Sequence, residues 1–167
     1  GAIGRGFALD CVAAVLKQRG HGDFLVEVGA DRIAMGRHPD HPWSVVVRDP
    51  RDPQPVLASL PLVDRAVATT VVDGRSGGRG PRAATLLLDP RTGFPATGLA
   101  AVTVLAPTAL LADALATAVA VLGPVKGLEL LERRADVDGI LITPTGQVLE
   151  TSRLKGKLAP RPAGLRP

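Results

Sequence analysis

Residues 106–123 of this chain read Ala106-Pro-Thr-Ala-Leu-Leu-Ala-Asp113-Ala-Leu-Ala-Thr117-Ala-Val-Ala-Val-Leu-Gly123. Alanine and leucine are among the strongest helix formers. Pro107 and Thr108 are typical of a helix start, and Gly123 with Pro124 is typical of a stop, so the stretch predicts a helix over residues 108–122. This helix is apolar on almost every side, which indicates that most of it is buried.

One charged side chain, Asp113, stands in the middle of the predicted helix, and no other lies between Arg91 and Lys126. Burying a carboxylate is costly unless it is paired or bound to a metal. Thr117 follows four residues later and therefore lies on the same helix face. A carboxylate and a hydroxyl presented together suit a hard cation such as Mg²⁺. The alternative is a helix with one solvent-exposed edge, on which Asp113 is simply hydrated.

The composition describes one domain of ordinary size. Of the 167 residues, 46% are hydrophobic but only 2% are aromatic, so we expect a core of Ala, Val and Leu. Neither a membrane span nor a signal peptide is expected, which favours a cytoplasmic location. The single cysteine, Cys11, excludes an internal disulfide and a cysteine-based zinc site. We expect it to be packed on a helix face, because free cysteines are commonly buried.

A net charge of +4 raises the question of nucleic-acid binding. Much of the excess positive charge lies in residues 75–82 and 153–166. The few aromatic residues, on which bases would stack, lie outside both segments, so we expect a solvated loop and tail and no nucleic-acid partner. His38 and His41 fall among turn residues, where we expect an exposed hairpin tip rather than a metal site.

Hydrophobic periodicity and turn residues divide the chain into helices and strands. Helices are predicted over residues 7–19, 108–122 and 126–134. Strands are predicted over residues 24–28, 32–35, 43–48, 56–60, 65–70, 84–88, 99–105, 139–143 and 147–151. Those over 56–60 and 65–70 are expected as successive antiparallel strands, and the last two as a hairpin. This order predicts an α+β fold with a largely antiparallel sheet and packed helices. We expect residues 1–158 to form the domain and residues 159–167 a Pro-rich, disordered tail.

Six segments together resemble motifs of the ApbE-type flavin transferases, the FAD:protein FMN transferases. Residues 1–10 resemble the GxIAKGYAVD segment of that family, residues 28–31 its GGD turn, residues 43–53 its W-x-V-x-I-x-D-P strand and residues 66–70 its AVATS segment. Residues 89–93 match IDPRTG, and residues 102–117 match VTVxAPxxxxADAxATA. Each motif is weak alone, but their common order and spacing favour this family and its ApbE-like (T-fold-like) architecture.

The resemblance implies a Mg²⁺-dependent transferase. Members of the family cleave FAD and join FMN, through a phosphoester bond, to a Thr or Ser hydroxyl of a partner protein. The resemblance maps catalysis and metal binding onto Asp113 and Thr117, with the backbone carbonyl of Ala2 as a further metal ligand.

The resemblance also implies a flavin-nucleotide site formed by Arg5, Asp31 and Thr69, with Asp31 and Thr69 in turns that line one pocket. Two structural roles are the alternatives. Asp31 could cap its own turn, and Thr69 could be an ordinary strand residue. Asp89 is expected to secure its own turn rather than to take part in chemistry.

The chain departs from the family pattern in four respects. It begins inside the family domain, which implies that an N-terminal half, with part of the FAD pocket, is separate or missing. Leu86 replaces a histidine that could handle a proton or bind phosphate. Residues 70–73 replace a Ser-Gly-Asp-Tyr stretch. Finally, Glu27 replaces an asparagine, and Arg5 replaces a lysine, which keeps the charge but changes its geometry.

Three functions remain open from the sequence. The first is FMN transfer, with the missing half of the domain supplied elsewhere. The second is a diverged ApbE-like protein that has lost flavin transfer and binds a flavin or nucleotide, or catalyses another reaction in a specialised pathway. The third is a non-enzymatic interaction module whose partner is the missing half.

Overall fold

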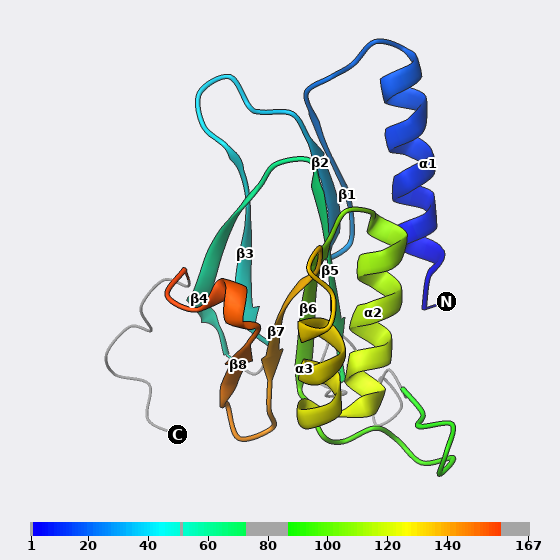
Figure 1. The fold of residues 1–167 in the computed structure, drawn as a ribbon, viewed down its shortest axis with the longest axis vertical. Helices are drawn as coiled ribbons and strands as arrows, with labels where there is room; N and C mark the ends of the chain where they lie inside the picture. Colours follow the sequence, from blue (N-terminus) through cyan, green and yellow to red (C-terminus); the bar gives the residue numbers. More distant parts are fainter. Residues whose placement is uncertain (1, 51, 73–86, 158–167) are drawn as a thin grey trace.

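The structure is a computed structural model that describes residues 2–50, 52–72 and 87–157. Its described part is an α+β fold, as the sequence predicts (Figure 1). The elements, in chain order, are α1 (Gly4–Gln18), β1 (Phe24–Val28), β2 (Asp31–Met35), β3 (Trp43–Asp49), β4 (Asp52–Leu62), β5 (Arg65–Val71), β6 (Ala101–Ala106), α2 (Ala109–Leu122), α3 (Pro124–Glu132), β7 (Asp138–Ile142), β8 (Val148–Glu150) and a 3-10 turn (Ser152–Leu154).

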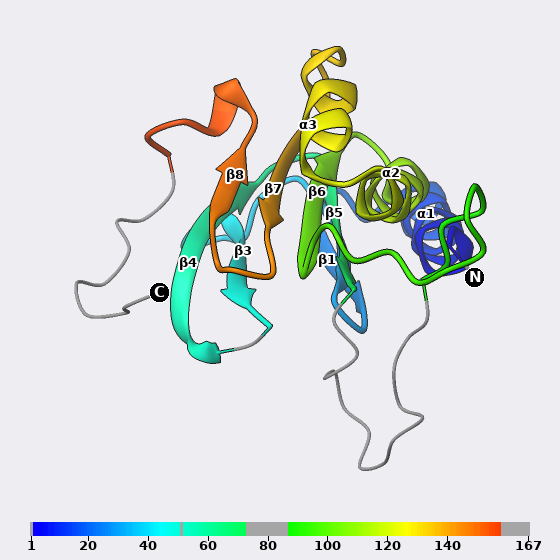
Figure 2. The ribbon, with the colours of Figure 1, turned by 90° about the horizontal axis from the view of Figure 1, so that it is seen from below.

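Two antiparallel sheets organise these elements. The larger sheet has six strands in the order β1-β2-β5-β6-β7-β8, and each neighbouring pair is antiparallel. β3 and β4 pair only with each other. The three helices cover one face of the six-stranded sheet and the β3–β4 hairpin covers the other (Figure 2). The central strands are therefore covered on both faces.

Strand β6 is covered on one face by α2 and on the other by the β3–β4 hairpin. All six of its residues are buried. Val102 and Val104 pack in the core under α2, whereas Leu105 packs in the core under the hairpin. Because both faces are covered, β6 reads as a continuous apolar run rather than as an alternating pattern.

Helix α2 is buried along most of its length, and its ends follow the expected signals. Thr108 caps the start by accepting a hydrogen bond from the N–H of Leu111, and Gly123 ends the helix with a φ of +80°, which favours glycine. The Asp113 side chain is only 2% exposed. The alternative of a hydrated Asp113 on an exposed edge is therefore wrong.

Three local predictions need correction. Cys11 is exposed rather than packed, because it lies about 200° around α1 from both Leu9 and Ala13, which face the sheet. Leu88, predicted in a buried strand, is half-exposed and forms only an isolated bridge with Pro95. β4 belongs to the separate hairpin and does not join β5 in the larger sheet.

Three predictions lie outside the described residues, namely the solvated loop over 75–82, the start of the 84–88 strand with Leu86, and the tail over 159–167. Within the described residues, no helix combines the length and apolarity that a membrane crossing requires.

Candidate functional site

The start of α2 is held against α1 by contacts between residues about 100 positions apart. The Asp10 carboxylate accepts hydrogen bonds from the N–H groups of Ala109 and Leu110, at 2.8 and 2.9 Å. Gly6 packs so closely that a Cβ added to it would lie 2.4 Å from the carbonyl oxygen of Ala109. A carboxylate at a helix N-terminus satisfies N–H groups that have no partner within the helix. These contacts determine where the first turns of α2 lie.

Asp113 lies one turn further along α2 and faces the same part of α1. Its Oδ2 accepts a hydrogen bond from the N–H of Gly6 at 3.1 Å. Its Oδ1 lies 3.9 Å from Nη2 of Arg5 and accepts no hydrogen bond from the described residues. Oδ2 thus anchors the Asp113 side chain. Oδ1 faces the Arg5 guanidinium and can still accept a further bond.

Arg5 and Asp31 form the strongest contact of the site. Arg5 Nε donates to Asp31 Oδ2 at 2.5 Å, and Asp31 is fully buried while the Arg5 side chain is half-exposed. This hydrogen bond to the Asp31 carboxylate raises the pKa of Arg5. The other oxygen of Asp31 accepts the backbone N–H of Thr69 at 3.1 Å. Since these partners are distant in sequence, Asp31 does not serve as a cap for its own turn.

Thr69 does not lie in a turn, as the family resemblance implied, but in the middle of β5. Its backbone meets Asp31, whereas its hydroxyl lies 3.0 Å from the hydroxyl of Thr103 on β6. Both threonines line a pocket of about 220 Å³ between β3 and the larger sheet. Side chains alternate between the faces of a strand, so Thr69 points away from the helix-covered face on which Asp31, Arg5 and Asp113 meet.

The predicted metal ligands fit a hard cation in their chemistry. Asp113 supplies a buried carboxylate, one oxygen of which accepts no hydrogen bond from the described residues, and half-buried Thr117 lies one helical turn away. Ala2 is exposed immediately before α1, four residues ahead of Gly6. All three supply oxygen donors, which suit Mg²⁺. In the described residues no group of three or more His, Cys, Asp or Glu side chains is placed to hold a metal, so such an ion would keep several non-protein ligands.

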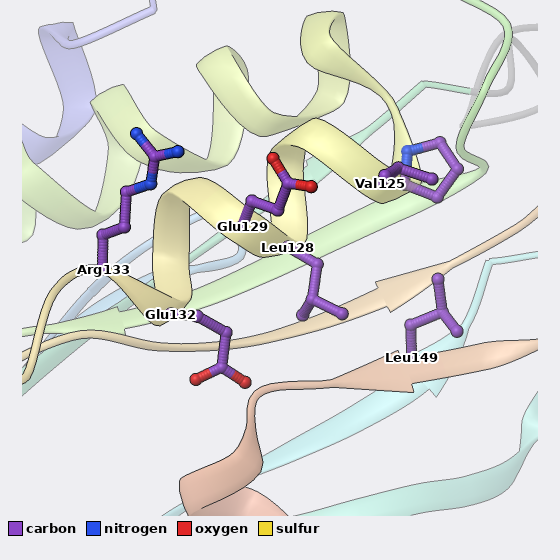
Figure 3. Close-up of a pocket in the computed structure, with 7 residues that line it drawn as sticks. Val125, Leu128, Glu129, Glu132, Arg133 and Leu149 are labelled. Carbon is purple, nitrogen blue, oxygen red and sulfur yellow. The ribbon is translucent and has the colours of Figure 1, made fainter.

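A larger pocket lies elsewhere. It has a volume of about 620 Å³ and opens between α3 and β8, where Leu128 and Leu149 lie on its facing sides (Figure 3). Glu132 lines this pocket, and its carboxylate accepts hydrogen bonds from the N–H and hydroxyl of Ser152. None of the residues predicted for the functional site lines it. We therefore place the candidate site at the α1–α2 junction, where the titratable groups converge.

The histidine loop, residues 36–42, connects β2 and β3 and contains no helix or strand. The rings of His38 and His41 stack in parallel with their centres 4.1 Å apart, and Trp43 meets His38 edge-on. His41 is exposed and His38 is partly exposed, as expected for an exposed hairpin tip.

Comparison with known proteins assigns the chain to a family. The family model described as "ApbE family" matches residues 1–141. This chain belongs to the ApbE family.

Relatives in the ApbE family include proteins named FAD:protein FMN transferase. The Escherichia coli K12 protein is 33% identical over 159 residues, covering 89% of this chain and 43% of its own length. The Haemophilus influenzae protein is 32% identical over 166 residues, with 94% and 47% covered. The chain therefore spans about half the length of the curated relatives it matches.

Solved ApbE structures share the fold. The apo form of the Pseudomonas stutzeri flavinyl transferase ApbE matches with a TM-score of 0.76 and 36% identity, covering 94% of this chain and 50% of that one. The ApbE protein of Thermotoga maritima matches with a TM-score of 0.80 and 28% identity, covering 95% and 52%.

Three residues that contact predicted site residues or their helices had no role assigned from the sequence: Gly6, Asp10 and Thr103. Gly6 carried a usable signal, because a glycine inside a helix costs about 1 kcal/mol relative to alanine and therefore suggests a packing reason. Asp10 and Thr103 carried none, because their partners are far away in the sequence.

Replacing Asp10 tests how α2 is held. We expect Asp10→Ala to lower the free energy of unfolding by about 2 kcal/mol, because two N–H groups of α2 lose their acceptor. Thr108→Ala removes only the local cap and is expected to cost about 1 kcal/mol. Urea unfolding followed by circular dichroism measures both. Equal losses in the two variants would show that Asp10 adds nothing beyond ordinary capping.

The turn Asp89–Gly93 behaves as predicted, since Asp89 accepts the backbone N–H of Arg91 and also pairs with its guanidinium. Chiefly through the side-chain hydrogen bond, Arg91 lowers the pKa of Asp89 to about 2 from an ordinary value of 3.8. The stabilisation by this pair is therefore complete above the unfolded-state pKa and disappears as the pH falls toward 2.

We accordingly expect the Asp89 carboxyl to titrate near pH 2 in the folded protein. In Arg91→Ala its midpoint should move back toward the ordinary value. Carboxyl ¹³C chemical shifts measured against pH report this midpoint. Identical midpoints in both proteins would contradict the assignment.

Proposed function

We propose that this chain is the part of a Mg²⁺-dependent FAD:protein FMN transferase that holds the metal and moves FMN onto a Thr or Ser hydroxyl of a partner protein. One observation carries the proposal. In a chain of the ApbE family, the Asp113 carboxylate is buried but keeps one oxygen free of hydrogen bonds from the described residues, and Thr117 lies one turn away.

Asp113 and Thr117, with the carbonyl of Ala2, are the residues proposed to hold the cation. When bound, Mg²⁺ neutralises charge on phosphoryl oxygens. The hydrogen bond from Gly6 fixes the orientation of the Asp113 carboxylate before any ligand arrives. This pre-organisation lowers the cost of reaching the productive geometry.

Arg5 is proposed to bind the phosphates of FAD. Asp31 fixes its guanidinium at Nε and keeps it protonated, while half of the side chain remains accessible. An arginine held in this way presents donors of fixed geometry to phosphoryl oxygens. Asp31 itself would act by positioning Arg5 and the strand at Thr69. The Thr69 hydroxyl lies on the face of the sheet that the β3–β4 hairpin covers. It can therefore contact the nucleotide only if the ligand reaches that face.

The proposed reaction exchanges one phosphate bond for another. The acceptor hydroxyl oxygen forms a bond to the phosphorus of the FMN portion of FAD, and the P–O bond to AMP breaks. The position at which the family carries a proton-handling histidine is Leu86 here. The relatives are about twice the length of this chain. We therefore also propose that the remaining half of the domain, joined or separate, completes the FAD pocket.

The test uses the complete protein as it is isolated, incubated with FAD, Mg²⁺ and a Thr-containing acceptor peptide. AMP is measured by chromatography, and covalent flavin is measured on the peptide. We expect equal amounts of both products, and neither with EDTA or with the Thr→Ala peptide. A protein that binds FAD but forms neither product, with any divalent cation, contradicts the transferase proposal.

A diverged, non-transferring protein is the second candidate, and the replacement of the family histidine by Leu86 favours it. Calorimetry with FAD separates the cases. Binding without turnover would indicate a flavin carrier or regulator, and no binding would indicate a different ligand.

A further inference from the structure

Helix α1 directs its charges inward. It carries three charged residues, and two of them contact other elements of the fold. Arg5 pairs with Asp31 and faces Asp113, while Asp10 binds the start of α2. The third, Lys17, is exposed, but at 100° per residue it falls on the α2 side of the helix and not on its outer face.

The outer face of α1 is apolar. Gly6, Leu9 and Ala13 are buried against the sheet and α2. The opposite side, centred about 180° away, is exposed and lacks any charge. It consists of the apolar residues Phe7, Ala8, Cys11, Val12, Ala14 and Val15, with the uncharged polar residue Gln18 at its C-terminal end, and we call it the outer α1 face.

This arrangement is the reverse of a surface helix, which places its polar residues toward water. Phe7 is 57% exposed and Val15 is 46% exposed. A contiguous apolar patch of this kind on a soluble domain marks an interaction surface. Helix α1 therefore has the composition of an interior helix that is covered on both sides.

We propose that the outer α1 face is the docking surface for the polypeptide that corresponds to the unmatched half of the ApbE relatives. This chain matches over about nine-tenths of its own length but covers only about half of each relative. A polypeptide of comparable length thus lacks a counterpart here. It must bury an apolar face of its own, and the outer α1 face offers a matching uncharged surface.

The same surface is continuous with the candidate site. Ala8 of the outer α1 face follows Arg5 by three residues and therefore lies beside it on the helix, and the Arg5 side chain is 50% exposed. A layer that covers α1 therefore also covers the open side of the Arg5–Asp113 contact and excludes water from it. The proposal concerns assembly and does not depend on the reaction proposed above.

Cys11 supplies a native reporter, because this single cysteine lies near the centre of the outer α1 face and is exposed. Its alkylation rate is measured by mass spectrometry of the Cys11 peptide in two samples. One is the 167-residue chain alone, and the other is the protein purified under native conditions from the cells that make it. We expect alkylation to be at least about 100-fold slower in the native protein.

Two variants separate docking from folding. Phe7→Glu with Val15→Lys places charges on the outer α1 face, and each charge has the sign that favours its end of the helix. Val125→Glu is the control, since Val125 is 69% exposed near the start of α3. We expect the double variant to keep its circular dichroism but to lose most of the Cys11 protection, and Val125→Glu to retain it.

Equal alkylation rates in the two wild-type samples would overturn the proposal. So would protection that appears in the 167-residue chain alone together with a dimer mass by light scattering, because a second copy would then be the occupant. Full protection in the double variant would place the docking surface elsewhere.

Discussion

Asp113→Asn is expected to lower kcat/KM for FMN transfer by at least about 10³-fold, corresponding to about 4 kcal/mol of transition-state stabilisation. The substitution keeps an oxygen that accepts the N–H of Gly6, so the local geometry is retained. It removes the charge that we propose holds the cation, and stabilisation by a bound metal is worth several kcal/mol. Activity measured against Mg²⁺ concentration should show that raising Mg²⁺ does not restore the wild-type rate.

Asp138→Asn provides the matched control. Asp138 is also a nearly buried carboxylate, but it pairs with Arg65 at 2.7 Å and Arg153 at 2.9 Å, away from the candidate site. We expect this variant to lose about 3 kcal/mol of unfolding free energy, because two arginines lose their shared counter-charge. Its kcat/KM should stay within a few-fold of wild type under conditions in which it is folded. If both variants lost activity equally, Asp113 would have no specific role.

Gly6→Ala is expected to lower kcat/KM by about 10²-fold, because a misplacement of about 1 Å has an effect of this size. The added methyl group would meet the Ala109 carbonyl at 2.4 Å and the Leu110 Cα at 2.7 Å, both backbone atoms that cannot rotate away. The two helices must separate, which moves Asp113 relative to Arg5. We also expect a loss of about 2 kcal/mol in the free energy of unfolding.

Gly4→Ala is the control for Gly6→Ala, since both glycines lie in α1 and a Cβ at Gly4 meets nothing within 4 Å. Because alanine is favoured over glycine in a helix by up to about 1 kcal/mol, we expect Gly4→Ala to be neutral or stabilising. Urea unfolding and the FMN-transfer assay measure both variants. A harmless Gly6→Ala would mean that the contact between α1 and α2 does not position the site.

Much of the fold was predictable because its signals are local. The strand Phe24–Val28 was predicted at its observed bounds, and α2 was predicted to within one residue, since Thr108 and Gly123 mark its ends. The apolar helix around Asp113 raised the possibility of its burial but left an exposed edge as the alternative, and the structure decided for burial. The family followed from six motifs in one order, and the match to residues 1–141 confirms it.

The site was predictable in its residues but not in its arrangement. Arg5, Asp31 and Asp113 do meet, yet the hydroxyl of Thr69 points to the opposite face of the sheet. A strand places alternate side chains on alternate faces, so this outcome depended on the register of β5 against its neighbours. The local sequence pattern also could not show that β4 pairs with β3 and not with β5.

Sequence by itself therefore determined the elements, the family and the identity of the buried acid, because helix propensity, turn chemistry and motif spacing act between neighbours in the chain. Only the tertiary structure decided that Asp10 and Gly6 hold α2, and that α1 turns its charges inward and its apolar face outward. The contacts of Asp10 and Gly6 with α2 join residues about 100 positions apart. Such contacts arise from the packing of whole elements, and no periodicity in a single segment encodes them.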